Sequence, residues 1–217
     1  MNTSLLPPQL NSELPQSSLQ QDVDVVIDAL FASFPDPHLL TAEQRTGIIA
    51  RYTSVLEGNF IYWMTAALIA AQSQEARSIL IENLYEEVRD AHPIMLRKFA
   101  VAAHAFPTDV DALAVDVDLT KMRRFLGRLS AVQSILTMAF FEGFIQRFMA
   151  YLADLAVAQG SSELEYTDVH GVCDVAHTAG LFRALSLEMA VNPLPPDKDP
   201  FEGVYLLRTL IQTIVRI

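Results

Sequence analysis

Three residues in the last third of the chain, His170, Asp174 and His177, have the types and spacing of metal ligands. A helix turns by about 100° per residue, so side chains at these positions share one stripe of one helix. Two imidazoles and a carboxylate are a typical ligand set for iron, zinc or manganese. A surface His–Asp–His cluster is the alternative, but three aligned ligands favour a metal.

Two single carboxylates, Glu57 and Glu142, interrupt long apolar runs, and each is followed directly by a glycine. A buried carboxylate without a partner is costly, so each needs a cation, a metal ion or a proton. We therefore predict both as metal ligands. The alternative is that each lies at the edge of its helix and reaches solvent.

Residues 81–93 supply further candidates. Glu82 and His92 are ten positions apart, and Pro93 disfavours helical geometry at the residue before it. A bend at this point would bring both side chains to one centre, so we predict both as metal ligands. We interpret Glu87 and Asp90 as part of a solvated acidic face.

Tyr85 and Arg89 lie on the same predicted helical stripe as Glu82. The guanidinium of Arg89 can bind a substrate carboxylate in a bidentate manner, and the Tyr85 phenol can be oxidised or donate a hydrogen bond. We name both as candidate catalytic residues. An ordinary surface location remains open for each.

The composition limits the classes of protein. The chain has 217 residues, 51% of them hydrophobic, and carries a formal charge of −11, which argues against nucleic acid as a partner. Cys173 is the only cysteine, so intramolecular disulfides and thiolate zinc modules are excluded. No signal peptide and no apolar run of spanning length is found, so we expect a cytoplasmic protein without a membrane span.

The elements that must position these residues are helices. Hairpin signals are absent, and the apolar residues recur with a helical period. Helices are predicted at about 22–34, 41–71, 74–91, 94–105, 119–159 (one bent helix or two), 166–191 and 201–217. Residues 1–21, rich in Ser, Gln and Pro, are predicted as a flexible N-terminal tail. The sequence thus indicates an all-α bundle of seven helices, forming a single domain over 22–217.

Four carboxylates and three imidazoles would serve two metal ions, and oxygen-rich ligation suits iron or manganese better than zinc. The predicted ligands are Glu57, Glu82, His92, Glu142, His170, Asp174 and His177. The Glu-x-x-His motif of ferritin-like di-iron bundles is absent, which argues against that fold.

The order of these seven residues resembles the haem-oxygenase-like di-iron oxidases and oxygenases. Their signature reads Glu, then Glu-x9-His, then Glu, then His-x3-Asp-x2-His, and the resemblance covers about residues 40–190. In size the chain is similar to the chlamydial death-domain-associating protein subgroup. The resemblance implies a seven-helix, TenA-like bundle with two iron ions, or manganese and iron, and O2 as co-substrate. It also implies oxidation of a small organic substrate, such as an amino acid or an aliphatic carboxylate.

Other functions stay open. A TenA-type hydrolase would use Cys173 as its nucleophile, and a haem oxygenase would need a proximal histidine, for which His38 is a weak match. A third alternative is a non-catalytic metal-binding or protein-interaction bundle. The apolar C-terminal helix is compatible with a homodimer face or with packing on the bundle itself.

Overall fold

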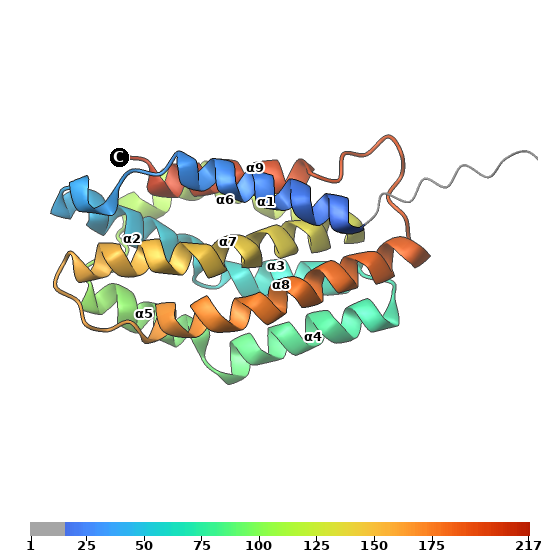
Figure 1. Ribbon diagram of the computed structural model, residues 1–217, viewed down its shortest axis with the longest axis horizontal. Coiled ribbons are helices and arrows are strands. Elements are labelled where there is room, and N and C mark those ends of the chain that lie inside the picture. The colour runs from blue at the N-terminus through green and yellow to red at the C-terminus, as the bar shows by residue number, and fades with distance from the viewer. Residues whose placement is uncertain (1–15) are drawn as a thin grey trace, which may run out of the picture.

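The computed structural model describes residues 16–217, which form an elongated bundle of α-helices (Figure 1). The helices are α1 (Gln16–Ala32), α2 (Ala42–Leu56), α3 (Asn59–Ala70), α4 (Gln74–Arg89), α5 (His92–Ala102), α6 (Asp109–Leu126), α7 (Ala131–Val157), α8 (Glu165–Val191) and α9 (Glu202–Val215), with a short 3-10 helix at Pro37–Leu39. The predicted all-α class is confirmed.

The predicted count of seven helices was wrong. The long helix expected over 41–71 is two helices, α2 and α3, because the chain turns at Gly58, whose φ is 76°. The apolar stretch over 119–159 is also divided, and α6 begins ten residues before the predicted start.

The predicted N-terminal tail is too long at its C-terminal end. Helix α1 already begins at Gln16, so residues 16–21 belong to it, while residues 1–15 of that prediction lie outside the described part of the chain. Leu19, Val23, Ile27 and Leu30 on α1 are buried at helical spacing, which explains why the helix extends this far.

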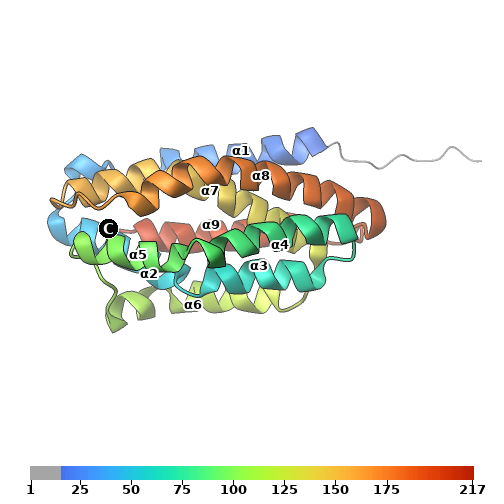
Figure 2. The ribbon, with the colours of Figure 1, turned by 90° about the horizontal axis from the view of Figure 1, so that it is seen from below.

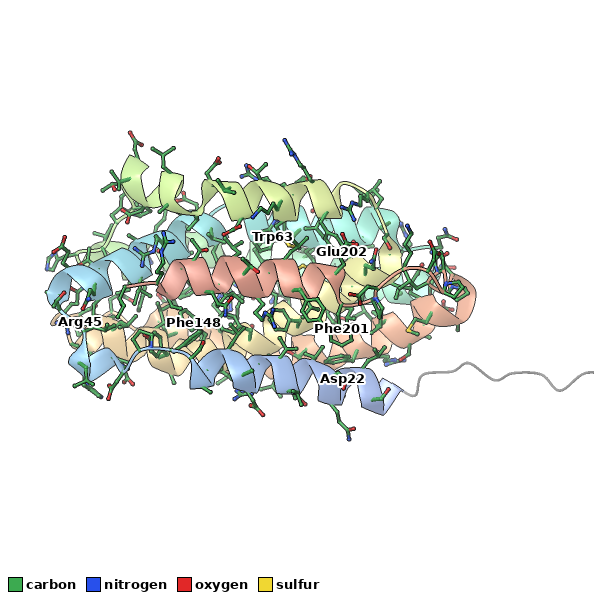
Figure 3. All side chains as sticks on the ribbon, turned by 90° about the horizontal axis from the view of Figure 1, so that it is seen from above. Asp22, Arg45, Trp63, Phe148, Phe201 and Glu202 are labelled. Atoms are coloured by element: carbon green, nitrogen blue, oxygen red, sulfur yellow. The ribbon has the colours of Figure 1, made fainter. Side chains whose placement is uncertain are left out.

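Helix α7 lies at the centre of the bundle. It packs against α8 and also contacts α1, α2, α3 and α9. Its side chains are buried on nearly all sides, which agrees with its unbroken apolar sequence. Figure 3 shows Trp63 of α3 and Phe148 of α7 between the helices, and both are fully buried.

Helix α8 lies between α7 and α4 (Figure 1), and α5 continues from α4 along the same side of the bundle (Figure 2). The start of α4 is attached to α8 by the Glu188 carboxylate, which is fully buried. It accepts backbone hydrogen bonds from Gln72 at 2.9 Å and from Ser73 at 2.9 Å. Within residues 16–217, no helix combines the length and the apolar character needed to cross a membrane.

The junction between α4 and α5 is a sharp turn. Ala91 has a φ of 57°, in the left-handed region that alanine rarely adopts. Pro93 follows in the first turn of α5, where a missing N–H costs nothing. The turn brings the Glu87 side chain, near the end of α4, into contact with His92 at the start of α5.

Candidate metal centre

The stripe predicted on α8 faces the interior. His170, Asp174 and His177 are 5%, 0% and 5% exposed. Nδ1 of His170 lies 3.3 Å from Oδ1 of Asp174, and Nδ1 of His177 lies 3.7 Å from the same oxygen. The spacing of four and three residues therefore collects three potential ligands in the space between α8 and its two neighbours, α7 and α4.

Glu142 joins this group from α7. Its side chain is buried, and Oε1 lies 3.8 Å from Nδ1 of His177. Burial, together with the negative charges of Asp174 and Glu87, raises the pKa of Glu142 well above its ordinary value. Without a bound cation, this carboxyl group resists ionisation.

The turn between α4 and α5 contributes Glu87 and His92, both about 5% exposed or less. Nδ1 of His92 lies 2.8 Å from Oε1 of Glu87, and the His92 ring contacts the His170 ring with centroids 4.4 Å apart. Burial lowers the pKa of His92, but the hydrogen bond and charge of Glu87, with the charge of Asp174, outweigh burial and raise it overall.

These residues form two sets that could each hold a metal ion. Glu87, His92 and His170 form the first, and Glu142, Asp174 and His177 form the second. Within each set, one ligand atom per residue lies within 4.8 Å of the others. Because His170 and Asp174 are in contact, the two sets are adjacent, as two ions of one binuclear centre would require.

Cys173 forms a third, overlapping set with His170 and Asp174. Burial and the charge of Asp174 raise the pKa of the Cys173 thiol, whose Sγ lies 3.2 Å from Oδ1 of Asp174. A neutral thiol is a poor ligand and a poor nucleophile. This environment argues against the TenA-type alternative, and His38, the weak haem-ligand candidate, is exposed.

The buried polar atoms of the centre fit a metal. Four of them have no hydrogen-bond partner: Oε1 of Glu142, Oδ2 of Asp174, Nε2 of His170 and Nδ1 of His177. Each such atom costs about 1–3 kcal/mol when it is removed from water. No Lys or Arg is among the buried residues of the described range, so apart from the histidines of the centre itself no buried side chain could compensate the carboxylates. Divalent metal ions would give these polar atoms partners and would balance the negative charge of the carboxylates.

Two predicted ligands lie elsewhere. Glu57 is the C-terminal cap of α2, beside the turn at Gly58, and forms an ion pair with the exposed Arg97. Glu82 is exposed, because the buried stripe of α4 runs through Ala76, Leu80, Asn83 and Glu87 instead. The chain does bend before Pro93, but at Ala91, and His92 is the first residue of α5. This turn brings Glu87, predicted on a solvated face, to the centre.

The two candidate catalytic residues also face solvent. Tyr85 is 60% exposed. Arg89 is exposed and pairs with the neighbouring Asp90 through a bidentate contact, with Nη2 2.6 Å from Oδ2, while its guanidinium lies 5.3 Å from the centroid of the Tyr85 ring. Neither residue is therefore retained in the site that we propose below.

An apolar cavity adjoins the first set. Its volume is about 30 Å³, room for about two water molecules. It is lined by Leu56, Phe60, Ile61, Glu87, His92, Pro93, Leu96, Glu142, Ile145, Tyr166 and His170. A cavity of this size accommodates O2, whereas an organic molecule would have to displace side chains.

A buried pair of phenols borders this cavity. The hydroxyl oxygens of Tyr52 and Tyr166 are 2.9 Å apart, and the Tyr166 ring contacts the His170 ring with centroids 4.5 Å apart. Burial raises the pKa of Tyr166 well above its ordinary value. One of the two hydroxyl protons is used in this contact, so the other is free for a different acceptor. Of the two tyrosines, Tyr166 is the one that lines the cavity.

A more polar groove reaches the second set from the surface. It has a volume of about 330 Å³ and is lined by Ile79, Glu82, Asn83, Glu86, Cys173, Ala176, His177, Gly180 and Arg183. Nδ2 of Asn83 is buried there without a partner, and Oε2 of Glu86 lies 2.7 Å from Nε2 of His177. The centre is thus approached by an apolar cavity on one side and a polar groove on the other.

Comparison with known proteins places these observations in a family. Residues 50–200 match the family model described as an iron-containing redox enzyme of the haem-oxygenase type. No curated protein matches the chain. The match spans α3 to α8 completely, and so includes both ligand sets. The chain belongs to the haem-oxygenase-like family of iron-containing redox enzymes.

Proposed function

We propose that the protein is a non-haem di-iron oxidase or oxygenase that uses O2 to oxidise a small organic substrate. The observation that carries the proposal is the pair of adjacent buried ligand sets, Glu87–His92–His170 and Glu142–Asp174–His177. Membership of an iron-containing redox family supports iron as the metal. Manganese in one position would be accepted by the same oxygen and nitrogen ligands.

The charges support two ions rather than one. Glu87, Glu142 and Asp174 are buried together without a Lys or Arg among the buried residues of the described range. One divalent ion would leave part of this charge uncompensated in the interior, where it is costly. Two divalent ions would allow all three carboxylates to ionise.

The protein's residues would hold the ions, exclude water and position the reactants. Bound iron would supply the electrons for reducing O2. Phe60, Leu96 and Ile145 line the small cavity with apolar side chains, and the buried Tyr166 borders it. The polar groove at His177 is large enough to admit a small organic substrate with polar groups.

The proposal is tested by anaerobic titration of metal-free protein with ferrous iron, followed by measurement of O2 consumption. We expect about two irons per chain in the wild type and loss of iron binding and O2 uptake in His170→Ala. The matched control is His38→Ala, since His38 is an exposed histidine far along the chain from the centre. It should bind iron like the wild type.

The outcomes separate the rival functions. Iron binding without O2 consumption would favour a non-catalytic metal-binding bundle. Absence of iron uptake, or iron uptake unchanged in His170→Ala, would refute the proposed centre. A competing titration with Mn²⁺ would show whether one position prefers manganese.

A further inference from the structure

We propose that Glu86 is a positioning residue that fixes the tautomer and the orientation of His177, so that Nδ1 of His177 faces the metal centre. The inference rests in part on the proposed metal centre, but its first consequence, the tautomer, concerns the metal-free protein. Glu86 belongs to neither ligand set.

The hydrogen bond determines which ring nitrogen carries the proton. Nε2 of His177 lies 2.7 Å from Oε2 of Glu86. A carboxylate only accepts hydrogen bonds, so Nε2 must be the protonated nitrogen of a neutral ring. The lone pair is then on Nδ1, which is the nitrogen available to a metal ion.

The surroundings of Nδ1 agree with this assignment. Nδ1 of His177 is buried and has no hydrogen-bond partner. It lies 3.7 Å from Oδ1 of Asp174 and 3.8 Å from Oε1 of Glu142, too far for hydrogen bonds. Two ligands at about 2.1 Å from one metal are separated by about 3.0–3.6 Å, so only a small contraction is needed for a shared ion.

His177 differs in this respect from the other two histidines of the centre. His92 pairs with Glu87, and His170 pairs with Asp174, and both carboxylates are themselves members of the ligand sets. Metal binding would compete with those contacts. The contact to Glu86 does not compete, because Glu86 lies behind the ring, on the side of the polar groove. It is therefore suited to persist in the metal-bound protein.

The expected loss of metal affinity on removing Glu86 can be taken from metal sites in general. Removing the outer hydrogen-bond partner of a ligating histidine commonly weakens metal affinity by about 10- to 100-fold. The Glu86 side chain is 34% exposed, and pairs with such exposure contribute little to folding. We therefore expect the loss in affinity without a comparable loss in stability.

The first test measures the tautomer directly. Metal-free protein labelled with 15N-histidine should show His177 protonated at Nε2, and Glu86→Ala should shift the ring toward a mixture of tautomers. Glu82→Ala is the matched control, because Glu82 lies one turn earlier on α4 and lines the same groove. It should leave the His177 signals unchanged. An unchanged tautomer in Glu86→Ala would overturn the inference while leaving the proposed function standing.

The second test measures metal binding. We expect Glu86→Ala to weaken anaerobic ferrous iron binding by about 10- to 100-fold at one position and to alter the visible spectrum of the Co²⁺-loaded protein. Glu86→Gln, whose amide oxygen can still accept from Nε2, should lie between Glu86→Ala and the wild type, and the urea midpoints of the metal-free variants should agree. If both variants bind one ion fewer, with full affinity at the other position, Glu86 is a direct ligand and the inference is wrong.

Discussion

The buried carboxyl group of Glu142 should make the metal-free protein less stable as the pH rises. The folded pKa of Glu142 lies well above its ordinary value of 4.5, because of burial and the charges of Asp174 and Glu87. The folded protein therefore binds a proton that the unfolded chain has already released. Stability from this group is complete below about pH 4.5 and is lost as the pH rises through the folded pKa.

The substitution Glu142→Gln should remove this loss of folding stability at high pH. Glutamine has nearly the same shape, carries no charge and cannot ionise. For each pH unit above 4.5 over which the folded Glu142 carboxyl group keeps its proton, the wild type loses about 1.4 kcal/mol of stability relative to the uncharged glutamine. The buried amide N–H group of glutamine needs a new partner, which offsets about 1–3 kcal/mol of this gain. We expect metal-free Glu142→Gln to be more stable than the wild type by about 2 kcal/mol at pH 8. Near pH 4.5 this gain is absent, so Glu142→Gln should be no more stable there than the wild type.

The assay is urea unfolding of both metal-free proteins at several pH values. With an m-value of about 2 kcal/mol per M, a difference of about 2 kcal/mol moves the midpoint by about 1 M. Taking the difference between the two proteins at each pH removes the contribution of the titrating groups that do not interact with Glu142. Glu82→Gln, at an exposed glutamate, should show no difference at any pH.

The result that would refute the reasoning is a constant difference across pH, or a Glu142→Gln protein that is less stable at pH 8. Either outcome would mean that the Glu142 carboxylate is stabilised in the folded protein. With ferrous iron present the order should reverse, because iron binds and stabilises the wild type and is held less well by the amide.

Further predictions concern the elements that hold the centre in place, and urea unfolding of metal-free protein measures each. Gly203→Ala should destabilise by about 2–3 kcal/mol, because its Cβ would overlap Oγ1 of Thr137 and the Phe125 ring. Gly171→Ala, on α8 with no atom near its Cβ, should instead stabilise by about 1 kcal/mol. Ala91→Gly should stabilise by about 0.5–1 kcal/mol by relieving the left-handed turn. Glu188→Ala should destabilise by about 3 kcal/mol, since the buried N–H of Ser73 and the partly buried N–H of Gln72 lose their acceptor.

Three of the ligands that could be predicted from the sequence lie within one helix. His170, Asp174 and His177 are placed together by helical periodicity alone, and the structure brings them together. Glu142 was recognisable because it is a lone carboxylate in an apolar run that continues on both sides. Glu57 has the same appearance in sequence, but Gly58 breaks the helix there, so the run does not continue as one buried face.

The part that could not be predicted depends on which face of α4 is buried. Glu82 begins a stripe of chemically active residues in the sequence, but its side chain is exposed. The buried stripe is marked by Ala76 and Leu80, and extending it by seven residues from Leu80 reaches Glu87. The spacing of Ala76, Leu80 and Glu87 is therefore a signal in the sequence that identifies Glu87 as a buried residue. The turn at Ala91, which sets the contact between Glu87 and His92, is a left-handed alanine that no propensity indicates.

The first ligand set has one further consequence. Glu87 and His92 come from the adjoining ends of α4 and α5, whereas His170 comes from α8, far along the chain. An ion bound there would act as a removable cross-link, since it would close a long loop of the polypeptide and reduce the conformational freedom of the unfolded chain. We therefore expect the amount of folded protein in a cell to follow its supply of iron, with the apo form removed sooner by proteases than the loaded form.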